Sequence, residues 1–339
     1  MLYIILAMIL AHGWKCTSFT ARRISPHRFM TATSMSSSVL DLLDGDQEIS
    51  STKSKTVKLY QQISSKSKSR AESQMTVLEG HRLIIDTLAD ERTRRKFRDI
   101  LVTREALLHD QLGSKLSDAL QITINDGCPV RLASESVMKM CTDTVTPQGV
   151  VALVEIPSGY DPTQDSKSDT SNKFYLLLDG MSDPGNVGTL LRSAKAVDVR
   201  ALILLPNCCD IWNPKVIRSS MGTAFTVPIK SVSSWDECLD LLNICGVSND
   251  RIFAATMEGS TSSKSVAHYD VDWKNGGPSA VCLGREGTGL SAEVREAVSS
   301  GQIRSVHVPM ADGIESLNAA VAGSVIMFEN YRQHACINE

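Results

Sequence analysis

The chain has 339 residues, more than one typical domain, so we expect two domains. Its hydrophobic content of 42% with 22% charged residues is ordinary for a globular protein with a substantial core. The net charge of -3 excludes nucleic-acid binding through overall charge, so any such role must rest on a local basic surface. The nine cysteines form no CxxC pair, which argues for a reducing compartment and against a disulfide framework or a zinc site.

Residues 1–45 have the character of a targeting sequence. The apolar run Leu2–Ala11 is too short to span a bilayer comfortably, and residues 17–39 hold three arginines and many Ser and Thr but no acid. This order resembles a two-part presequence for a secondary plastid, with Phe19 just after the first cut. Mitochondrial import is the second interpretation; a secreted protein or a wrongly assigned start remain, and the free cysteines speak against secretion. We therefore exclude residues 1–45 from the predicted fold and expect no membrane segment in the mature protein.

Residues 46–74 form a basic segment before the first predicted strand. The stretch Lys53–Arg70 contains six basic residues and no acidic one. It is either a solvated linker or a first helix, and contact with RNA phosphates is the functional alternative.

Residues 75–157 predict a small α/β domain. An apolar strand (Met75–Leu78), a helix (Gly80–Ala89), a basic turn and a second strand come first. The stretch "VRLASESVMKMCTDTVTPQGVVALVEIP" then supplies strand, helix and strand again. The polar residues 158–173 that follow lack periodicity and predict a linker.

Residues 174–335 predict a second, larger α/β domain. Short all-apolar runs separated by helical stretches are typical of a parallel sheet covered on both faces. The predicted strands are Phe174–Leu178, Ala201–Leu205, Ala224–Val227, Ile252–Ala255, Ala280–Leu283 and Val306–Val308, and a final helix begins near Ser316.

Three glycine-containing loops follow predicted strands of this domain. The first loop (residues 179–186, "DGMSDPGN") lacks the lysine and the spacing of a P-loop, and GxGxxG is absent as well. It places Asn186 just before a helix that carries Arg192. In the plain interpretation, Asn186 is a helix cap and Arg192 a surface charge.

The second loop (residues 284–290, "GREGTGL") and the third loop (residues 308–318, "VPMADGIESLN") lie near the C-terminal end. Glu286 sits inside the second loop, where its carboxylate can accept hydrogen bonds from backbone N–H groups. Ser316 is a good candidate for the cap of the last helix. Asn318 in an apolar helix is harder to explain structurally, because asparagine is a poor helix former.

Together the loops contain NxGxxxR, LGxEGxGL and VPMxxGxxSLNxAxA in this order. They resemble the three signature motifs of the SpoU (TrmH-type) RNA 2′-O-ribose methyltransferases of the SPOUT superfamily. "NPKVIRSSMGTAFTVPI" is similar to the middle segment of that family, and "VLEGHRLIIDTL" with "TPQGVVALVEI" resembles its N-terminal substrate-binding domain of L30e-like fold. Ala319, Ala320 and Asp312 depart from the common pattern without removing a polar group.

The resemblance implies a SPOUT-type parallel sheet with a C-terminal trefoil knot, a rare exception to unthreaded chains, behind a smaller L30e-like α/β domain. S-adenosylmethionine would be held in the knot by backbone groups and apolar walls. The residues implied in cofactor binding are Leu283, Gly284, Val308, Met310 and Leu317.

The first loop would then serve the RNA substrate. The resemblance implies that Arg192 contacts the target ribose or its phosphate. A guanidinium stays protonated, so we assign it to positioning and charge stabilisation, not to proton removal. Asn186, Glu286, Ser316 and Asn318 would form the surrounding polar cluster, with Glu286 holding Asn186 or a knot backbone group. No metal is required, and the resemblance implies a homodimer with each site completed across the interface.

The main interpretation is thus an organellar ribosomal RNA 2′-O-methyltransferase. A catalytically silent RNA-binding assembly factor is the alternative from another class, and retention of the polar residues argues against it. Transfer RNA as substrate is a third possibility, opposed by the N-terminal domain through analogy alone. The interpretation as a nucleotide-dependent oxidoreductase fails, because no glycine fingerprint follows the first strand.

Overall fold

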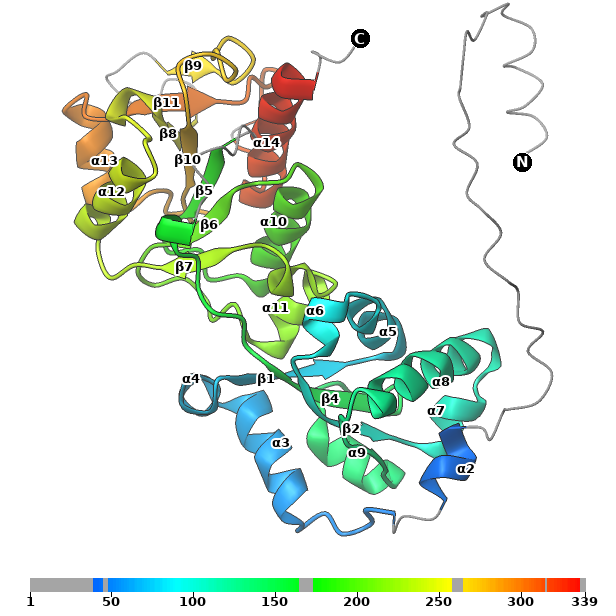
Figure 1. Ribbon diagram of the computed structural model, residues 1–339. Coiled ribbons are helices and arrows are strands. Elements are labelled where there is room, and N and C mark those ends of the chain that lie inside the picture. The colour runs from blue at the N-terminus through cyan, green and yellow to red at the C-terminus, as the bar shows by residue number, and fades with distance from the viewer. Residues whose placement is uncertain (1–38, 45–47, 165–172, 258–264, 315, 336–339) are drawn as a thin grey trace, which may run out of the picture. The chain divides into compact units, whose positions relative to one another are not determined.

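The computed structural model describes residues 39–44, 48–164, 173–257, 265–314 and 316–335. The described residues form two lobes, one built on a four-stranded sheet and the other on a seven-stranded sheet (Figure 1). Residues 1–38 and 45 of the predicted leader, and residues 165–172 of the predicted linker, lie outside the described residues. Within the described ranges, no helix is both long enough and apolar enough to cross a membrane.

The N-terminal lobe has a mixed sheet of order β1-β4-β2-β3, in which β4 is antiparallel to both neighbours and β2 is parallel to β3. Its strands are β1 (Met75–Glu79), β2 (Phe97–Val102), β3 (Val130–Leu132) and β4 (Val150–Glu155). Its helices are α2 (Val39–Leu43), α3 (Lys55–Ser65), α4 (Ser67–Ser73), α5 (His81–Ala89), α6 (Glu91–Arg94), α7 (Arg104–Leu108), α8 (Asp110–Asn125) and α9 (Glu135–Cys141). The strand–helix order predicted for this lobe is confirmed, but helix α8 was not predicted.

The lobe begins earlier than predicted. Val39 and Leu43 of α2 are buried in the main core, so the described residues before position 45 belong to the fold and not to a leader. Their i, i+4 spacing places both on one helix face, a signal too short to recognise beside the preceding serines. The basic segment likewise contains a packed helix, because Val57, Tyr60 and Ile63 of α3 are buried against the sheet.

The C-terminal lobe has an all-parallel sheet of order β7-β6-β5-β10-β8-β11-β9, which confirms the predicted sheet type. Its strands are β5 (Phe174–Leu178), β6 (Ala201–Leu204), β7 (Ile229–Ser231), β8 (Ile252–Ala255), β9 (Val266–Ala267), β10 (Ser279–Leu283) and β11 (Arg304–His307). Its helices are α10 (Pro184–Ala196), α11 (Pro214–Ser219), α12 (Trp235–Ile244), α13 (Ala292–Ser299) and α14 (Ala319–Ala335), with short 3₁₀ turns η1 (Pro162–Gln164), η2 (Thr223–Phe225) and η3 (Asn249–Arg251).

Strand β5 shows why both faces of this sheet are covered. Phe174, Leu176 and Leu178 belong to the core shared with α10, α11 and α14, whereas Tyr175 and Leu177 belong to the core shared with α12 and α13. All five side chains are 1% exposed or less. Since successive side chains of a strand point to opposite faces, an all-apolar strand requires a helical layer on each side.

One predicted strand is wrong. Residues 224–227 form part of the turn η2 and its exit, and β7 begins only at Ile229. Gly222 before the turn adopts a φ of 78°, and Pro228 has no N–H to donate to a neighbouring strand. The chain therefore enters the sheet one residue after the proline.

Candidate active site

The three loops leave the sheet at neighbouring carboxyl ends. Leu178 of β5 is opposite Leu283 of β10, so the first and second loops start side by side. Strand β8 pairs with both β10 and β11, and the third loop follows β11. Ligand sites of open α/β sheets lie at such carboxyl ends.

Helix α10 starts from a cap that the sequence did not identify. Asp183 accepts a hydrogen bond from the backbone N–H of Asn186 at 2.8 Å, and Pro184 occupies the first helical position. Asn186 is therefore not the cap, and its side-chain amide is available for other contacts. The signal for Asp183 was the Asp-Pro pair, which commonly opens a helix.

A cluster of three polar side chains joins the loops. The side-chain amide nitrogen of Asn318 donates to Oδ1 of Asn186 at 2.9 Å and to a carboxylate oxygen of Glu286. Its carbonyl oxygen accepts from the backbone N–H groups of Ala320 (2.9 Å) and Val321 (3.2 Å). Both ends of one amide are thus used, which a carboxylate or an alkyl side chain could not do. We refer to Asn186, Glu286 and Asn318 as the amide cluster.

The amide cluster corrects two expectations. Asn318, not Ser316, caps the last helix, which begins at Ala319. Glu286 holds Asn318 and reaches Asn186 only through it. Ser316 is exposed, and no hydrogen bond among the described residues connects it to the cluster.

Arg192 lies away from the amide cluster within one chain. It follows Asn186 by six residues on α10, which corresponds to about 9 Å along the axis and about 120° around it. Its side chain is exposed, and no carboxylate of the described residues lies within ion-pair distance. The structure therefore groups Asn186, Glu286 and Asn318 but leaves Arg192 on a different face of the helix.

The predicted cofactor residues surround the ends of β10 and β11. Gly284 is half-buried and tightly enclosed, since a Cβ there would come within 2.5 to 2.7 Å of the backbone of Gly289 and Leu290. Val308 and Met310 are half-buried, and Leu317 is 38% exposed. A glycine cradle with accessible apolar side chains fits the adenosine portion of S-adenosylmethionine.

Leu283 does not form the expected apolar wall. Its side chain is 2% exposed and lies against Gly323 of α14, where a Cβ would overlap it. Its carbonyl oxygen accepts from the backbone N–H of Asp179 at 2.8 Å. Leu283 therefore belongs to the core beneath the site.

Two contributions were missed in the sequence. Thr256 follows β8 and is level with Gly284 and His307 by register, and Met257 comes next and is 52% exposed. Asp179 is buried, and its carboxylate accepts from the backbone N–H of Ser291 at 2.6 Å, which fixes the exit of the second loop. Thr256 and Asp179 each come directly after a buried parallel strand, and this position is the signal by which the sequence could have identified them.

We expect Gly284→Ala to lower the affinity for S-adenosylmethionine at least about tenfold, because the added methyl group must displace backbone rather than a flexible side chain. Isothermal titration calorimetry measures the affinity, and thermal unfolding reports whether the fold survives. Gly159→Ala is the matched control, since its Cβ meets one carbonyl oxygen at 3.3 Å. Equal affinity in both variants would contradict the cradle.

The cysteines near the loops are buried or half-buried. Burial raises the pKa of the Cys208 and Cys282 thiols above the usual range, which disfavours the nucleophilic thiolate. In the described ranges, no group of three or more His, Cys, Asp or Glu side chains is placed to hold a metal ion.

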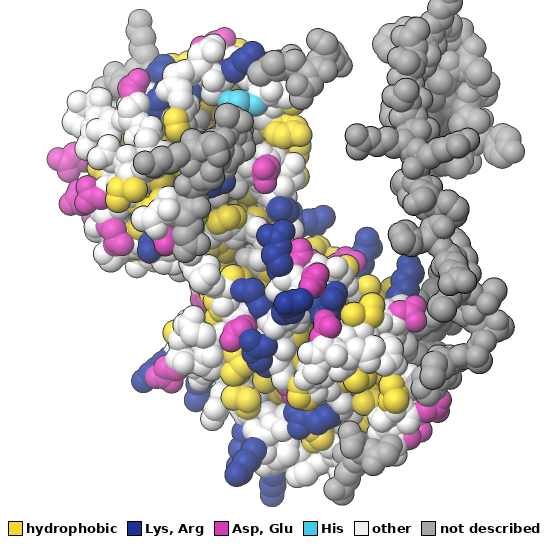
Figure 2. All heavy atoms as spheres, in the orientation of Figure 1, with side chains coloured by type: hydrophobic (Ala, Val, Ile, Leu, Met, Phe, Trp, Pro, Cys, Tyr) yellow, Lys and Arg dark blue, Asp and Glu magenta, His cyan; other side chains and the backbone are white. Residues whose placement is uncertain are grey.

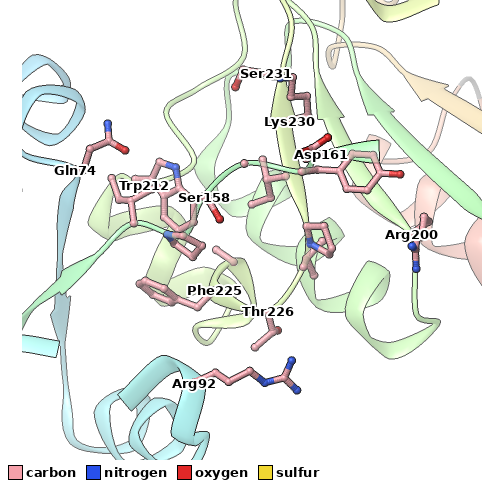
Figure 3. Close-up of a pocket in the computed structure, with 18 residues that line it drawn as sticks. Gln74, Arg92, Ser158, Asp161, Arg200, Trp212, Phe225, Thr226, Lys230 and Ser231 are labelled. Atoms are coloured by element: carbon pink, nitrogen blue, oxygen red, sulfur yellow. The ribbon is translucent and has the colours of Figure 1, made fainter. Parts of the chain in front are cut away.

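A concave surface of about 640 Å³ lies beside strand β7, apart from the three loops (Figure 3). Arg92 of α6 reaches toward Thr226 at its lower edge, and Trp212 and Phe225 line its wall with ring centroids 5.6 Å apart. Arg200 and Lys230 also line it. Basic side chains gather over the adjoining helices α5 and α6 (Figure 2). This cleft combines cations with aromatic rings, as surfaces for single-stranded nucleic acid do.

Two family models match the chain. The SpoU rRNA Methylase family matches residues 173–328, and the MRM3-like substrate binding domain matches residues 54–152. The second match begins within the basic segment, in agreement with the packing of α3 in the N-terminal lobe.

Curated relatives include mitochondrial rRNA methyltransferases. The mouse protein rRNA methyltransferase 3 is 29% identical over 76% of this chain and 67% of its own length. The zebrafish protein rRNA methyltransferase 3A is 30% identical over 80% of this chain and 67% of its own length. A 23S rRNA guanosine 2′-O-methyltransferase from Bacillus subtilis is 26% identical over 83% of this chain and 98% of its own length. The chain spans 56% of the length of human rRNA methyltransferase 3, to which it is 30% identical.

Solved structures show the same fold. An S-adenosylmethionine-bound rRNA methyltransferase from Sinorhizobium meliloti is similar with a TM-score of 0.66 and 24% identity, over 85% of this chain and 98% of that one. The SpoU methyltransferase AviRb from Streptomyces viridochromogenes, also with that cofactor, gives 0.65 and 24% over 84% and 100%. The α/β fold with a parallel sheet is thereby confirmed as that of SPOUT methyltransferases, and the trefoil knot stays a prediction. The chain belongs to the SpoU family of S-adenosylmethionine-dependent RNA methyltransferases.

Proposed function

We propose that this protein methylates the 2′-oxygen of one ribose in the large-subunit ribosomal RNA of an organelle. The observation that carries this is the amide cluster, because it joins all three loops of the site through one fully used side chain. The names of the mouse, zebrafish and Bacillus subtilis relatives support ribosomal RNA as the substrate.

In this proposal Gly284, Val308, Met310 and Leu317 hold the cofactor. When bound, S-adenosylmethionine supplies a methyl group on a positively charged sulfur, which is already an activated leaving group. The enclosed backbone at Gly284 fixes the cofactor side of the site. The amide cluster keeps the first loop in register with the second and third loops, so that ribose and methyl group can meet in a reactive geometry.

Arg192 acts on the ribose or an adjacent phosphate. A guanidinium is a poor proton acceptor, so the role of Arg192 is to position the substrate and to stabilise negative charge that develops on the 2′-oxygen. The 2′-hydroxyl proton passes to a phosphate oxygen or to water. Ser316 is retained as a polar residue at the edge of the site, where its exposed hydroxyl can contact RNA.

The separation of Arg192 from the amide cluster supports a homodimer in which a second copy completes each site. Helix α14 presents an apolar stripe that a second copy would cover: Val321, Phe328 and Tyr331 are 48%, 49% and 44% exposed. The stripe lies close to Arg192. Ser193, the next residue after Arg192 on α10, forms a hydrogen bond of 2.8 Å with Ser324 of α14.

We expect Phe328→Glu to convert the dimer into a monomer and to abolish methyl transfer, because burial of a charge at an apolar contact is costly. Light scattering after gel filtration measures the mass. Ile244→Glu is the control, since Ile244 is 68% exposed on α12 and lies outside the stripe. A dimeric and active Phe328→Glu variant would refute α14 as the interface.

The cleft beside β7 supports a path for RNA that flanks the target. Arg92 comes from the lobe matched by the substrate-binding domain, and Lys230 comes from the catalytic lobe. Phosphates can contact these cations while a base stacks near Trp212.

The proposed location is an organelle, and a plastid is the specific prediction. The mitochondrial names of the mouse and human relatives support an organelle in general. The features that favour a plastid lie in residues 1–38, outside the described residues. Import of a fluorescent fusion of residues 1–50 tests the prediction.

The test of function is transfer of tritiated methyl groups from S-adenosylmethionine onto organellar ribosomal RNA transcripts, followed by nuclease mapping of 2′-O-methylation. One labelled ribose would establish both the activity and the target. Label on transfer RNA alone would refute ribosomal RNA as the substrate. Absence of transfer to naked RNA and to partly assembled ribosomal subunits, despite cofactor binding, would favour the silent RNA-binding alternative.

A further inference from the structure

The second loop carries a cation that the amide cluster does not use. Arg285 directly precedes Glu286, and two backbone hydrogen bonds of 3.0 Å between Arg285 and Gly289 close the loop into a tight hairpin. The guanidinium of Arg285 lies against Gly180 in the first loop, where a Cβ would overlap it. Gly180 also has a φ of 66°, so both its conformation and its lack of a side chain suit this contact.

The strand register explains why this pair meets. Gly180 and Arg285 each lie two residues beyond the opposed pair Leu178 and Leu283, at the junction of β5 and β10. The cofactor residues Val308 and Met310 follow β11, which is separated from β10 by β8. Arg285 is thus on the substrate side of the second loop, next to the first loop.

The charge of Arg285 is available to a ligand. Its side chain is exposed, and no carboxylate in the described part of the chain lies within ion-pair distance. Asp179, the buried acid of the first loop, accepts a hydrogen bond from the backbone N–H of Ser291 at 2.6 Å. A planar guanidinium held at a fixed position can bind two oxygens of one phosphate.

We propose that Arg285, held against Gly180, is a binding site for an RNA phosphate next to the target ribose. This inference rests on the proposed function, since it assigns a substrate contact at the same site. The amide cluster supports the assignment, because Glu286 adjoins Arg285 and connects through Asn318 to Asn186 of the first loop. A phosphate on Arg285 would therefore be anchored beside the loop that receives the ribose.

The test compares Arg285→Ala, Arg285→Lys and Arg295→Ala in the full-length protein. The control Arg295 is also exposed and follows the same loop, on α13. The probe is a fluorescein-labelled organellar large-subunit rRNA transcript, titrated at several KCl concentrations. Steady-state methyl transfer and calorimetric S-adenosylmethionine binding complete the set.

For Arg285→Ala we expect RNA affinity to fall about tenfold, because one charge-assisted contact is lost. The slope of log K against log salt should decrease in magnitude by about 0.7, the value for one phosphate on single-stranded RNA. KM for RNA should rise, kcat should change by less than about threefold, and cofactor affinity should stay unchanged. Arg285→Lys should retain the salt slope, and Arg295→Ala should match the unaltered protein.

A second variant tests the contact itself. Gly180→Ala places a methyl group where the guanidinium lies, so it should weaken RNA binding like Arg285→Ala and add little in the double variant. Thermal unfolding separates this effect from backbone strain at the positive φ.

Three results would overturn the site: an unchanged salt slope in Arg285→Ala, the same losses in Arg295→Ala, or weaker cofactor binding in place of weaker RNA binding. These results differ from those expected if the proposed function is wrong. If the unaltered protein binds the transcript but transfers no methyl group, the activity is refuted, while the salt slope still decides the phosphate contact.

Discussion

Methyl transfer by the Arg192→Ala variant is expected to fall by about 100- to 1,000-fold, the usual effect of removing one donor that stabilises developing charge. The affinity for S-adenosylmethionine should remain, because Arg192 lies on α10, whereas the cofactor residues follow β10 and β11. Single-turnover transfer measures the chemical step, and calorimetry measures cofactor binding.

Two further variants make the Arg192 result specific. Arg192→Lys keeps the positive charge without the planar fork, so an intermediate rate would indicate bidentate contact. Arg295→Ala removes an exposed arginine of α13 and should leave the rate unchanged. Loss of cofactor affinity in Arg192→Ala would refute the assignment of the first loop to RNA and of the second and third loops to the cofactor.

Asn318→Asp is expected to separate the two uses of the Asn318 amide. The new carboxylate can still accept from the N–H groups of Ala320 and Val321, so the cap of α14 is kept. It cannot donate to Asn186, and it faces the carboxylate of Glu286. We expect a loss of methyl transfer of about 100-fold, with a change in the free energy of unfolding below about 1 kcal/mol.

The comparison with Asn318→Ala sharpens this prediction. Alanine removes the cap as well, which costs about 1 kcal/mol of stability. In the double variant Asn318→Asp with Glu286→Gln, a glutamine amide can donate to the new aspartate and restore the link with donor and acceptor exchanged. Full activity in Asn318→Asp alone would show that the amide cluster is dispensable.

The prediction of Ala224–Val227 as a strand failed for a local reason that depends on context. Apolar runs of four residues fit a strand or a turn equally well, and the choice was made by Gly222 and Pro228 at its ends. Val39–Leu43 was missed because two buried side chains on a single helical turn give too short a pattern. The side chain of Leu283 was misplaced because a strand residue faces either the core or the site, and only the packing of Leu283 against Gly323 of α14 decided which.

The sequence by itself determined the parallel sheet, the order of the two lobes and the family. Strand β5 and residues 280–283 of β10 are uninterrupted apolar runs, and the three loops carry their polar residues at fixed distances from the strands that precede them. Such features depend on residues close together in the chain, so they can be recognised without a structure.

Only the tertiary structure decided which polar groups meet. Asn318 bonds to Asn186 across 132 residues and to Glu286 across 32, and the pattern along the chain does not specify which of the candidate side chains will be paired. The cap of α14 moved from Ser316 to Asn318, and Arg285 came to lie on Gly180, because strand register and helix packing set these contacts. Hydrogen bonds act over about 3 Å, so the partners of a side chain are fixed only when the whole sheet has brought the loops together.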